Sequence, residues 1–250
     1  MNYICPFKMY MNSRIKFVAF IVLLLLEFLC FPCHAQNSKM LKDANKKMVK
    51  HNYIGALKEY DKLIIKYPDY AETYAHRALA KFRLEDQQGA LDDVSKAIQL
   101  DSNFYTAYSI RAQFYLAFKY FKEAVDDYSR CILLQPQNEM AWHERGLAKV
   151  EANDCDGAIK DLDSTLKIKP EFVDAIYQKG IARMRMKNYT GAIHDFNTYL
   201  KINPQMPMAY LKRGICYDKT GQNYKACKDW LRASMRGLQE ANALMKMKCK

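Results

Sequence analysis

Residues 139–172 read EMAWHERGLAKVEANDCDGAIKDLDSTLKIKPEF, and the pattern of this 34-residue stretch recurs along most of the chain. The recurrence is clearest at one alanine, which stands at positions 56, 90, 124, 158, 192 and 226 with no insertion or deletion between them. A period of this length is typical of helix-turn-helix units, each of which buries its apolar face only against a neighbour. The sequence therefore predicts six stacked pairs of helices.

Further columns repeat with the alanine. In the quoted unit they are the large residue Trp142, the small residue Gly146, the second large residue Leu162 and the closing Pro170. A small residue lets two helix axes approach closely, and a large side chain fills the space beside the contact. Proline cannot continue the preceding helix, so it sets the turn into the next unit.

This combination of columns resembles the tetratricopeptide repeat family, and the resemblance extends over nearly the whole chain after residue 36. It implies an all-α fold, a right-handed α-solenoid of six helix-turn-helix units plus a C-terminal capping helix. The expected units are residues 37–70, 71–104, 105–138, 139–172, 173–206 and 207–240, with the capping helix at 239–250.

Two charged columns repeat in five units. A cation precedes the small residue, and an aspartate lies sixteen residues after that cation. The interpretation is a ladder of partly buried ion pairs between the two helices of each unit, which fixes register more than it adds stability. The alternative is that the cations bind a ligand. The predicted pairs are Arg77 with Asp93, Arg111 with Asp127, Arg145 with Asp161, Lys179 with Asp195, and Arg213 with Asp229.

The segment before the repeats differs in composition. Lys8, Arg14 and Lys16 precede an apolar run at residues 17–26, and small residues follow before Gln36. This order is typical of a secretory signal peptide, with cleavage expected after Ala35. Glu27 leaves the run short of the roughly 20 apolar residues that span a bilayer. The alternative is an uncleaved membrane anchor, and membrane association is expected only in that case.

The net charge of the chain is +12, and cleavage of three basic residues and one acidic residue would lower it to +10. A basic protein often binds nucleic acid, but no helix carries a run of lysine and arginine along one face, and export would separate the protein from nucleic acid. We therefore expect no nucleic-acid partner. A solvated lysine-rich exterior is the simplest interpretation, and an acidic protein or anionic envelope surface is the alternative.

Five cysteines lie after residue 35. The last unit predicts a helix over 224–236 that ends at Gly237, followed by an antiparallel helix from Gln239. Cys227 and Cys249 would then lie about 15 and 18 Å from the turn along the two helices. In an oxidising compartment we expect a disulfide between them. Cys131 and Cys155 are interpreted as packing residues, and the pairing of Cys131, Cys155 and Cys216 is left open.

A search for catalytic and metal-binding motifs finds none. The histidines after residue 35 are dispersed over four units, without an HExxH motif or zinc-ligand spacing. No glycine-rich phosphate loop or GxSxG motif occurs. We expect no enzyme activity, no catalytic residues, no metal and no cofactor.

In the tetratricopeptide repeat family the first helices line a concave groove. Family members that bind a C-terminal carboxylate use Lys and Asn side chains. The corresponding positions here hold Ala75, Ser109, His143, Leu79 and Gln113, so we expect no such carboxylate site. We expect instead an extended peptide or an amphipathic helix of another protein. The expected partner-binding residues are His76, Arg83, Gln113, Met140, His143, Glu144, Tyr177, Gln178, Arg185, Leu211, Lys212 and Lys219.

The sequence thus predicts an exported, non-enzymatic binding scaffold of a bacterial periplasm or cell envelope. One alternative is a membrane-tethered envelope assembly factor, and another is an accessory subunit of a cell-wall or carbohydrate-processing complex. Self-association through the end faces of the solenoid is left open.

Overall fold

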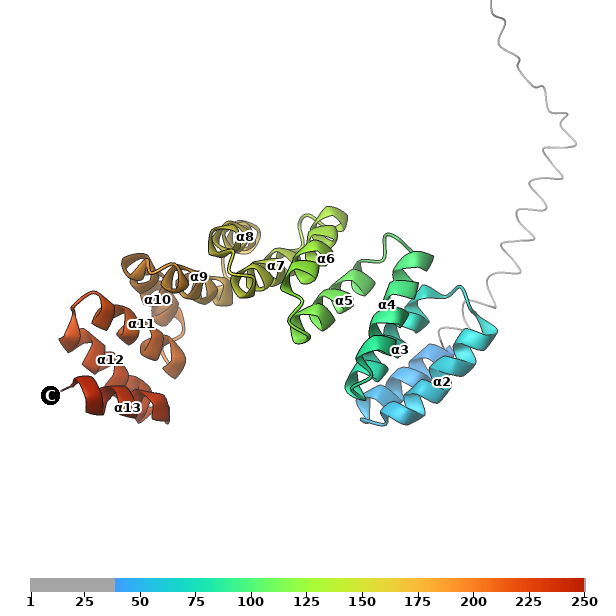
Figure 1. The fold of residues 1–250 in the computed structure, drawn as a ribbon, viewed down its shortest axis with the longest axis horizontal. Coiled ribbons are helices and arrows are strands. Elements are labelled where there is room, and N and C mark those ends of the chain that lie inside the picture. The colour runs from blue at the N-terminus through green and yellow to red at the C-terminus, as the bar shows by residue number, and fades with distance from the viewer. Residues whose placement is uncertain (1–38, 250) are drawn as a thin grey trace, which may run out of the picture. The chain divides into compact units, whose positions relative to one another are not determined.

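The computed structural model describes residues 39–249, so the predicted signal segment 1–35 lies outside the described residues. The described chain is all-α, as expected, and residues 39–249 contain no strand (Figure 1). In chain order the helices are residues 39–49, α2 (Tyr53–Lys66), α3 (Ala71–Arg83), α4 (Gln87–Leu100), α5 (Tyr105–Ala117), α6 (Phe121–Leu134), α7 (Glu139–Glu151), α8 (Cys155–Ile168), α9 (Val173–Arg185), α10 (Tyr189–Ile202), α11 (Pro207–Lys219), α12 (Asn223–Met235) and α13 (Gln239–Lys248).

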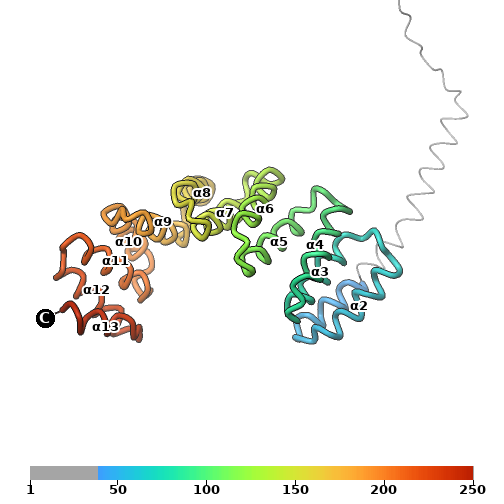
Figure 2. The backbone as a smooth tube through the Cα atoms, in the orientation of Figure 1, coloured from blue at the N-terminus to red at the C-terminus, as the bar shows by residue number. Residues whose placement is uncertain are grey.

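The helices form two compact units, residues up to Asp93 and residues from Val94 onward. In the second unit each helix from α5 to α13 packs on the next, and Figure 2 traces these successive hairpins. Odd-numbered helices up to α11 are the first helices of the repeats, and even-numbered helices are the second. α13 follows the last repeat. Because α7 also contacts α9 and α9 contacts α11, these three first helices adjoin one another.

The turn between the two helices of a repeat has a fixed local chemistry. One residue per turn adopts left-handed backbone, with φ between 57° and 74°, at His51, Glu85, Lys119, Asn153, Lys187 and Gly221. In four repeats the next residue caps the second helix, because its side chain accepts a hydrogen bond from the backbone N–H three residues on. These caps are Asn52, Asp86, Asp154 and Asn188.

The small-residue column brings paired helices into close contact in the second unit. A Cβ added to Gly180 of α9 would lie 2.7 Å from Phe196 Cε1, and one added to Gly214 of α11 would lie 2.6 Å from Trp230 Nε1. Phe196 and Trp230 are themselves fully buried. The helix pairs α9–α10 and α11–α12 therefore have no room for a larger residue at these positions.

We expect Gly214→Ala to lower the free energy of unfolding by about 1–3 kcal/mol, because overpacking against Trp230 outweighs the higher helix propensity of alanine. Urea unfolding followed by circular dichroism measures the change. Gly146→Ala is the matched control, since its added Cβ would lie 3.1 Å from Leu162 Cγ. A smaller loss in Gly214→Ala than in Gly146→Ala would contradict the steric explanation.

Candidate partner-binding surface

The predicted partner-binding residues differ in how far they reach solvent. Arg83 at the end of α3, Gln113 on α5, Met140 on α7 and Lys219 on α11 are exposed. Met140 is 43% exposed, so an apolar side chain lies at the surface among polar ones. Glu144, Gln178 and Lys212 are half-buried. We call the surface formed by Gln113, Met140, Glu144, Gln178, Lys212 and Lys219 the first-helix face.

Two predicted contact residues are buried, and the prediction for them needs correction. Leu211 is 0% exposed and packs in the core with Ala226 and Trp230. His143 is 7% exposed, and its ring centroid lies 4.8 Å from that of Phe172 in the loop before α9. Neighbouring elements cover these two side chains, and the helical period alone does not reveal such burial.

Three further predicted residues are already engaged in contacts inside the protein. Arg185 donates to the Val150 carbonyl at 2.5 Å and pairs with Glu151 at 2.6 Å, so it joins α9 to the end of α7. The ring of Tyr177 lies 5.2 Å from that of Tyr199, and burial raises the pKa of Tyr177 to about 12. In the first unit His76 stacks on Tyr60, and burial lowers the pKa of His76.

The cation column forms bidentate pairs with aspartate in four repeats. Arg111 donates from Nε and Nη2 to the two carboxylate oxygens of Asp127, both at 2.7 Å. The Asp127 carboxylate raises the pKa of Arg111. The same two-bond geometry joins Arg77 to Asp93, Arg145 to Asp161, and Arg213 to Asp229. Both partners are largely withdrawn from solvent, so these pairs are interior contacts.

Each of these four arginines also bonds the second helix of the preceding repeat through its Nη1 atom. Arg145 Nη1 donates to Ser129 Oγ at 3.0 Å, while its Nε and Nη2 hold Asp161. One arginine of α7 thereby bonds both α6 and α8. Equivalent Nη1 contacts join Arg77 to Asp61, Arg111 to Ser95, and Arg213 to Asn197. We call this three-helix arrangement the arginine clasp.

The pairing predicted for Lys179 with Asp195 is wrong. Lys179 Nζ lies 2.5 Å from Asp163 of the preceding second helix, and Arg183 Nη1 lies 2.6 Å from both carboxylate oxygens of Asp195. The three donors of a lysine diverge from a single nitrogen, so Lys179 lacks the wide planar fork with which an arginine bonds acceptors on two different helices. Arg183, one turn further along α9, takes the place of the missing fork.

The acceptors on the preceding helix were not predicted from the sequence. They occupy a column of Asp61, Ser95, Ser129, Asp163 and Asn197, spaced 34 residues apart. Every member can accept a hydrogen bond. Its coincidence with the cation column, sixteen residues later, is the signal that would have revealed the clasp.

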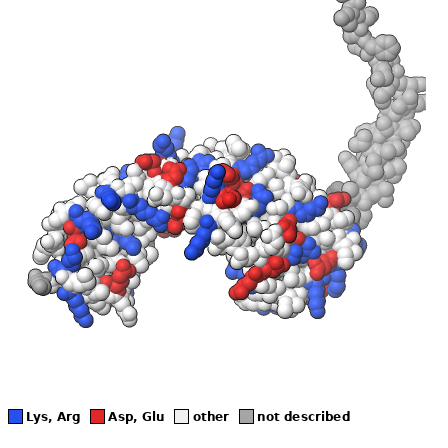
Figure 3. Space-filling model, viewed as in Figure 1, with Lys and Arg blue, Asp and Glu red and all other residues white. Residues whose placement is uncertain are grey.

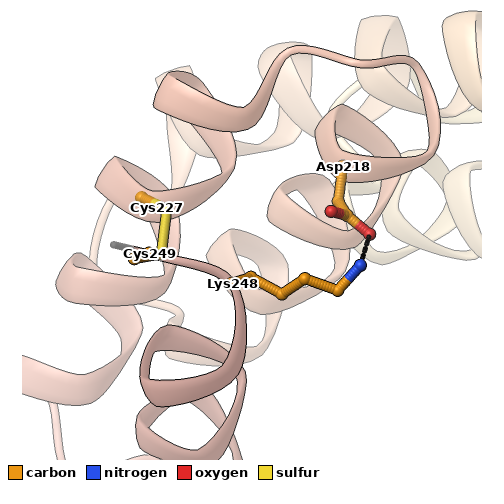
Figure 4. The surroundings of a disulfide bond; sticks show 4 residues. All are labelled: Asp218, Cys227, Lys248 and Cys249. Atoms are coloured by element: carbon orange, nitrogen blue, oxygen red, sulfur yellow. Dashed lines mark hydrogen bonds and ion pairs between the residues drawn. A yellow bond between two sulfur atoms is a disulfide. The ribbon is translucent and has the colours of Figure 1, made fainter.

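Cys227 on α12 and Cys249 after α13 lie with their Sγ atoms 1.95 Å apart, at bonding distance (Figure 4). Beside them, Lys248 Nζ lies 3.4 Å from Asp218 Oδ2 on α11. Cys131, Cys155 and Cys216 are free and buried. Burial raises the pKa of the Cys131 thiol to about 12 and that of Cys216 to about 11.

The described residues also bear on three other kinds of site: a charged surface, a metal site and a membrane-spanning helix. On the face drawn in Figure 3, basic side chains are interspersed with acidic ones. Within residues 39–249, no three His, Cys, Asp or Glu side chains gather as a metal site would require. None of the helices described has the length and apolar character of a bilayer-spanning helix.

Comparison with protein families gives matches to one repeat type. A profile described as "Tetratricopeptide repeat" matches residues 143–207 and 177–237, and a second profile of the same description matches residues 105–138. Together these ranges include more than half of the chain. No curated relative matches the sequence.

Solved structures with similar folds share the repeat architecture. A tetratricopeptide repeat protein from Parabacteroides merdae is 17% identical, with a TM-score of 0.67 over 86% of this chain and 99% of its own. YrrB, a repeat protein with an unusual peptide-binding site, is 21% identical, with a TM-score of 0.63 over 76% and 97%. MamA is 24% identical, with a TM-score of 0.60 over 66% and 90%. At these identities the likeness shows the fold.

The clasp predicts a large difference between two aspartates of α8. Asp161→Ala leaves Arg145 and Lys149 without their shared carboxylate, so we expect a loss of about 3 kcal/mol in the free energy of unfolding. Asp163 is 55% exposed, and Asp163→Ala is expected to cost about 1 kcal/mol or less. Urea unfolding compares the two variants, and equal losses would contradict an interior role for the Asp161 pair.

Proposed function

This chain belongs to the tetratricopeptide repeat family, and we propose that it is a non-enzymatic scaffold that holds an extended peptide or an amphipathic helix of a partner protein on its first-helix face. Proteins of this family are generally scaffolds for protein–protein interaction. The family therefore supports a binding role and the non-enzymatic assignment, and the exposed side chains of the first helices support the location of the site.

The observation that carries the location is the set of exposed first-helix side chains that form no hydrogen bond or ion pair among the described residues. Gln113, Met140 and Lys219 are exposed on α5, α7 and α11. By contrast, the arginine and aspartate columns are used inside the protein. A surface methionine flanked by polar and charged groups is the kind of residue from which interface anchors are drawn. The likeness to YrrB, a repeat protein with a peptide-binding site, is compatible with a peptide ligand.

We further propose that the protein is exported to the periplasm or cell envelope. The basic, apolar and small-residue order of residues 1–35 supports export. Cys227 of α12 and Cys249 lie side by side, so in an oxidising compartment a disulfide would link α12 to the end of α13. A membrane-tethered assembly factor is the second candidate, and it requires that the apolar segment be retained.

The location of the site is tested by photo-crosslinking in the native source. A photoreactive amino acid is placed at Met140 or Lys219 on the first-helix face, and at Lys160 of α8 or Lys228 of α12 as matched exposed controls on second helices. We expect the two first-helix positions to give crosslinks to the same partner, identified by mass spectrometry. We expect the second-helix positions to give none to that partner.

Equal crosslinking from both sets, or crosslinking from the second helices alone, would show that the partner binds elsewhere. A partner that crosslinks only outside the first-helix face would leave the scaffold role intact and remove the proposed site.

Export is tested by mass spectrometry of the protein purified from its native source without reductant. We expect the chain to begin at Gln36 and the peptide containing Cys227 to be linked to the one containing Cys249. Cys131 and Cys216 serve as internal controls, because burial and raised thiol pKa values should prevent their alkylation in the folded protein. A retained apolar segment favours the tethered alternative, and free thiols at both Cys227 and Cys249 contradict the disulfide.

A further inference from the structure

A pocket of about 460 Å³ opens between α10, α11 and α12, and none of the residues that line it belongs to the first-helix face. Its size falls in the range of small-molecule sites in proteins. The residues that line it are His194, Asn197, Thr198, Leu200, Lys201, Tyr210, Arg213 and Arg232. Three of them are permanent cations, and none carries a carboxylate.

The positive charge of the pocket is only partly neutralised. The side chain of Asp229 is 3% exposed, and both of its carboxylate oxygens accept hydrogen bonds from Arg213. Arg232 lies 3.4 Å from the same carboxylate, a long contact, and is 42% exposed. Among the described residues, Lys201 has no ion-pair partner. One acid therefore faces three fixed cations, and the excess charge lies on Lys201 and Arg232.

The cations are held in position by an aromatic ring. The guanidinium carbons of Arg213 and Arg232 lie 5.4 and 5.6 Å from the centroid of the Tyr210 ring, and that of Arg236 lies 5.1 Å away. Arg236 is also tied to the Arg232 carbonyl at 3.0 Å. Cation–π contact and hydrogen bonds thus keep several like charges together at one wall of the pocket. Such pre-organisation lowers the cost of binding an anion.

The equivalent junction of an earlier repeat shows whether packing requires the side chains of this pocket. Two units earlier, at the junction of α6, α7 and α8, the same columns hold Asp126 in place of His194, Leu133 in place of Lys201, and Ser164 in place of Arg232. The clasp of Arg145 with Asp161 and Ser129 forms there without these cations. Packing of the repeat therefore does not require the three cationic or ionisable side chains at the last junction.

We propose that this pocket binds a phosphate monoester group, carried either by a small soluble molecule or by a lipid headgroup. A phosphate monoester carries up to two negative charges, which matches the two cations left without full neutralisation. The planar fork of arginine suits the tetrahedral oxygens of phosphate. The pocket volume exceeds what one ion needs, so it leaves room for a small polar body attached to the phosphate. This site is independent of the first-helix face.

The test is calorimetric titration of the full exported chain with glycerol 3-phosphate, with glycerol and acetate as control ligands. We expect binding of glycerol 3-phosphate that weakens as salt is raised, and no measurable heat with either control. Arg232→Gln and Lys201→Gln should each weaken binding about tenfold or more, as expected for loss of a charge-assisted hydrogen bond. Lys167→Gln is the matched control, because Lys167 occupies the column of Lys201 one unit earlier on α8.

A second arm uses vesicles that contain phosphatidic acid, whose headgroup is also a phosphate monoester. Binding to these vesicles alone, with the same dependence on Arg232 and Lys201, supports the site and assigns the phosphate to a lipid. Binding to glycerol 3-phosphate assigns it to a soluble molecule. The proposal is overturned if neither probe binds, if acetate binds equally well, or if Lys167→Gln weakens binding as much as Lys201→Gln. Both lysines are exposed, so these two variants should fold normally.

Discussion

Each helix pair in this chain can bury its apolar face only against the next pair, and this constraint governs the rest of the structure. The alanine column and the small-residue column allow the close approach, as the contacts of Gly180 and Gly214 with Phe196 and Trp230 demonstrate. Apolar packing of this kind has little directional preference. The register between neighbouring repeats therefore depends on contacts that do have direction.

The arginine clasp supplies that direction. A guanidinium group offers donors in a fixed plane, so one side chain can bond two helices at defined angles. Arg145 does so between α6 and α8, and three other arginines repeat the arrangement. Since buried pairs of this kind gain little net free energy, their contribution is to the geometry of stacking more than to its strength. Lys179 and Arg183 show that the chain preserves the contacts even where the residue that makes them moves by one turn.

The repeated arginines and aspartates bond one another inside the protein, so they are not free to bind a ligand. The arginines that precede the small residue are paired inside the protein, whereas Lys201 and Arg232 lie at an open pocket. The same distinction applies to the first helices, where Gln113 and Met140 reach solvent but Leu211 lies in the core.

The 34-residue period determined by itself that the chain is all-α and built from stacked helix pairs, because large, small and proline positions recur in phase and only helices satisfy that spacing. It also indicated that Cys227 and Cys249 lie at similar distances from Gly237. Only the tertiary structure decided which partner each cation takes, how deeply His143 and Leu211 are covered, and that His194, Lys201 and Arg232 line one pocket. The physical reason is that the period specifies the side of a helix on which a residue lies, whereas burial and pairing depend on atoms contributed by the preceding and following repeats.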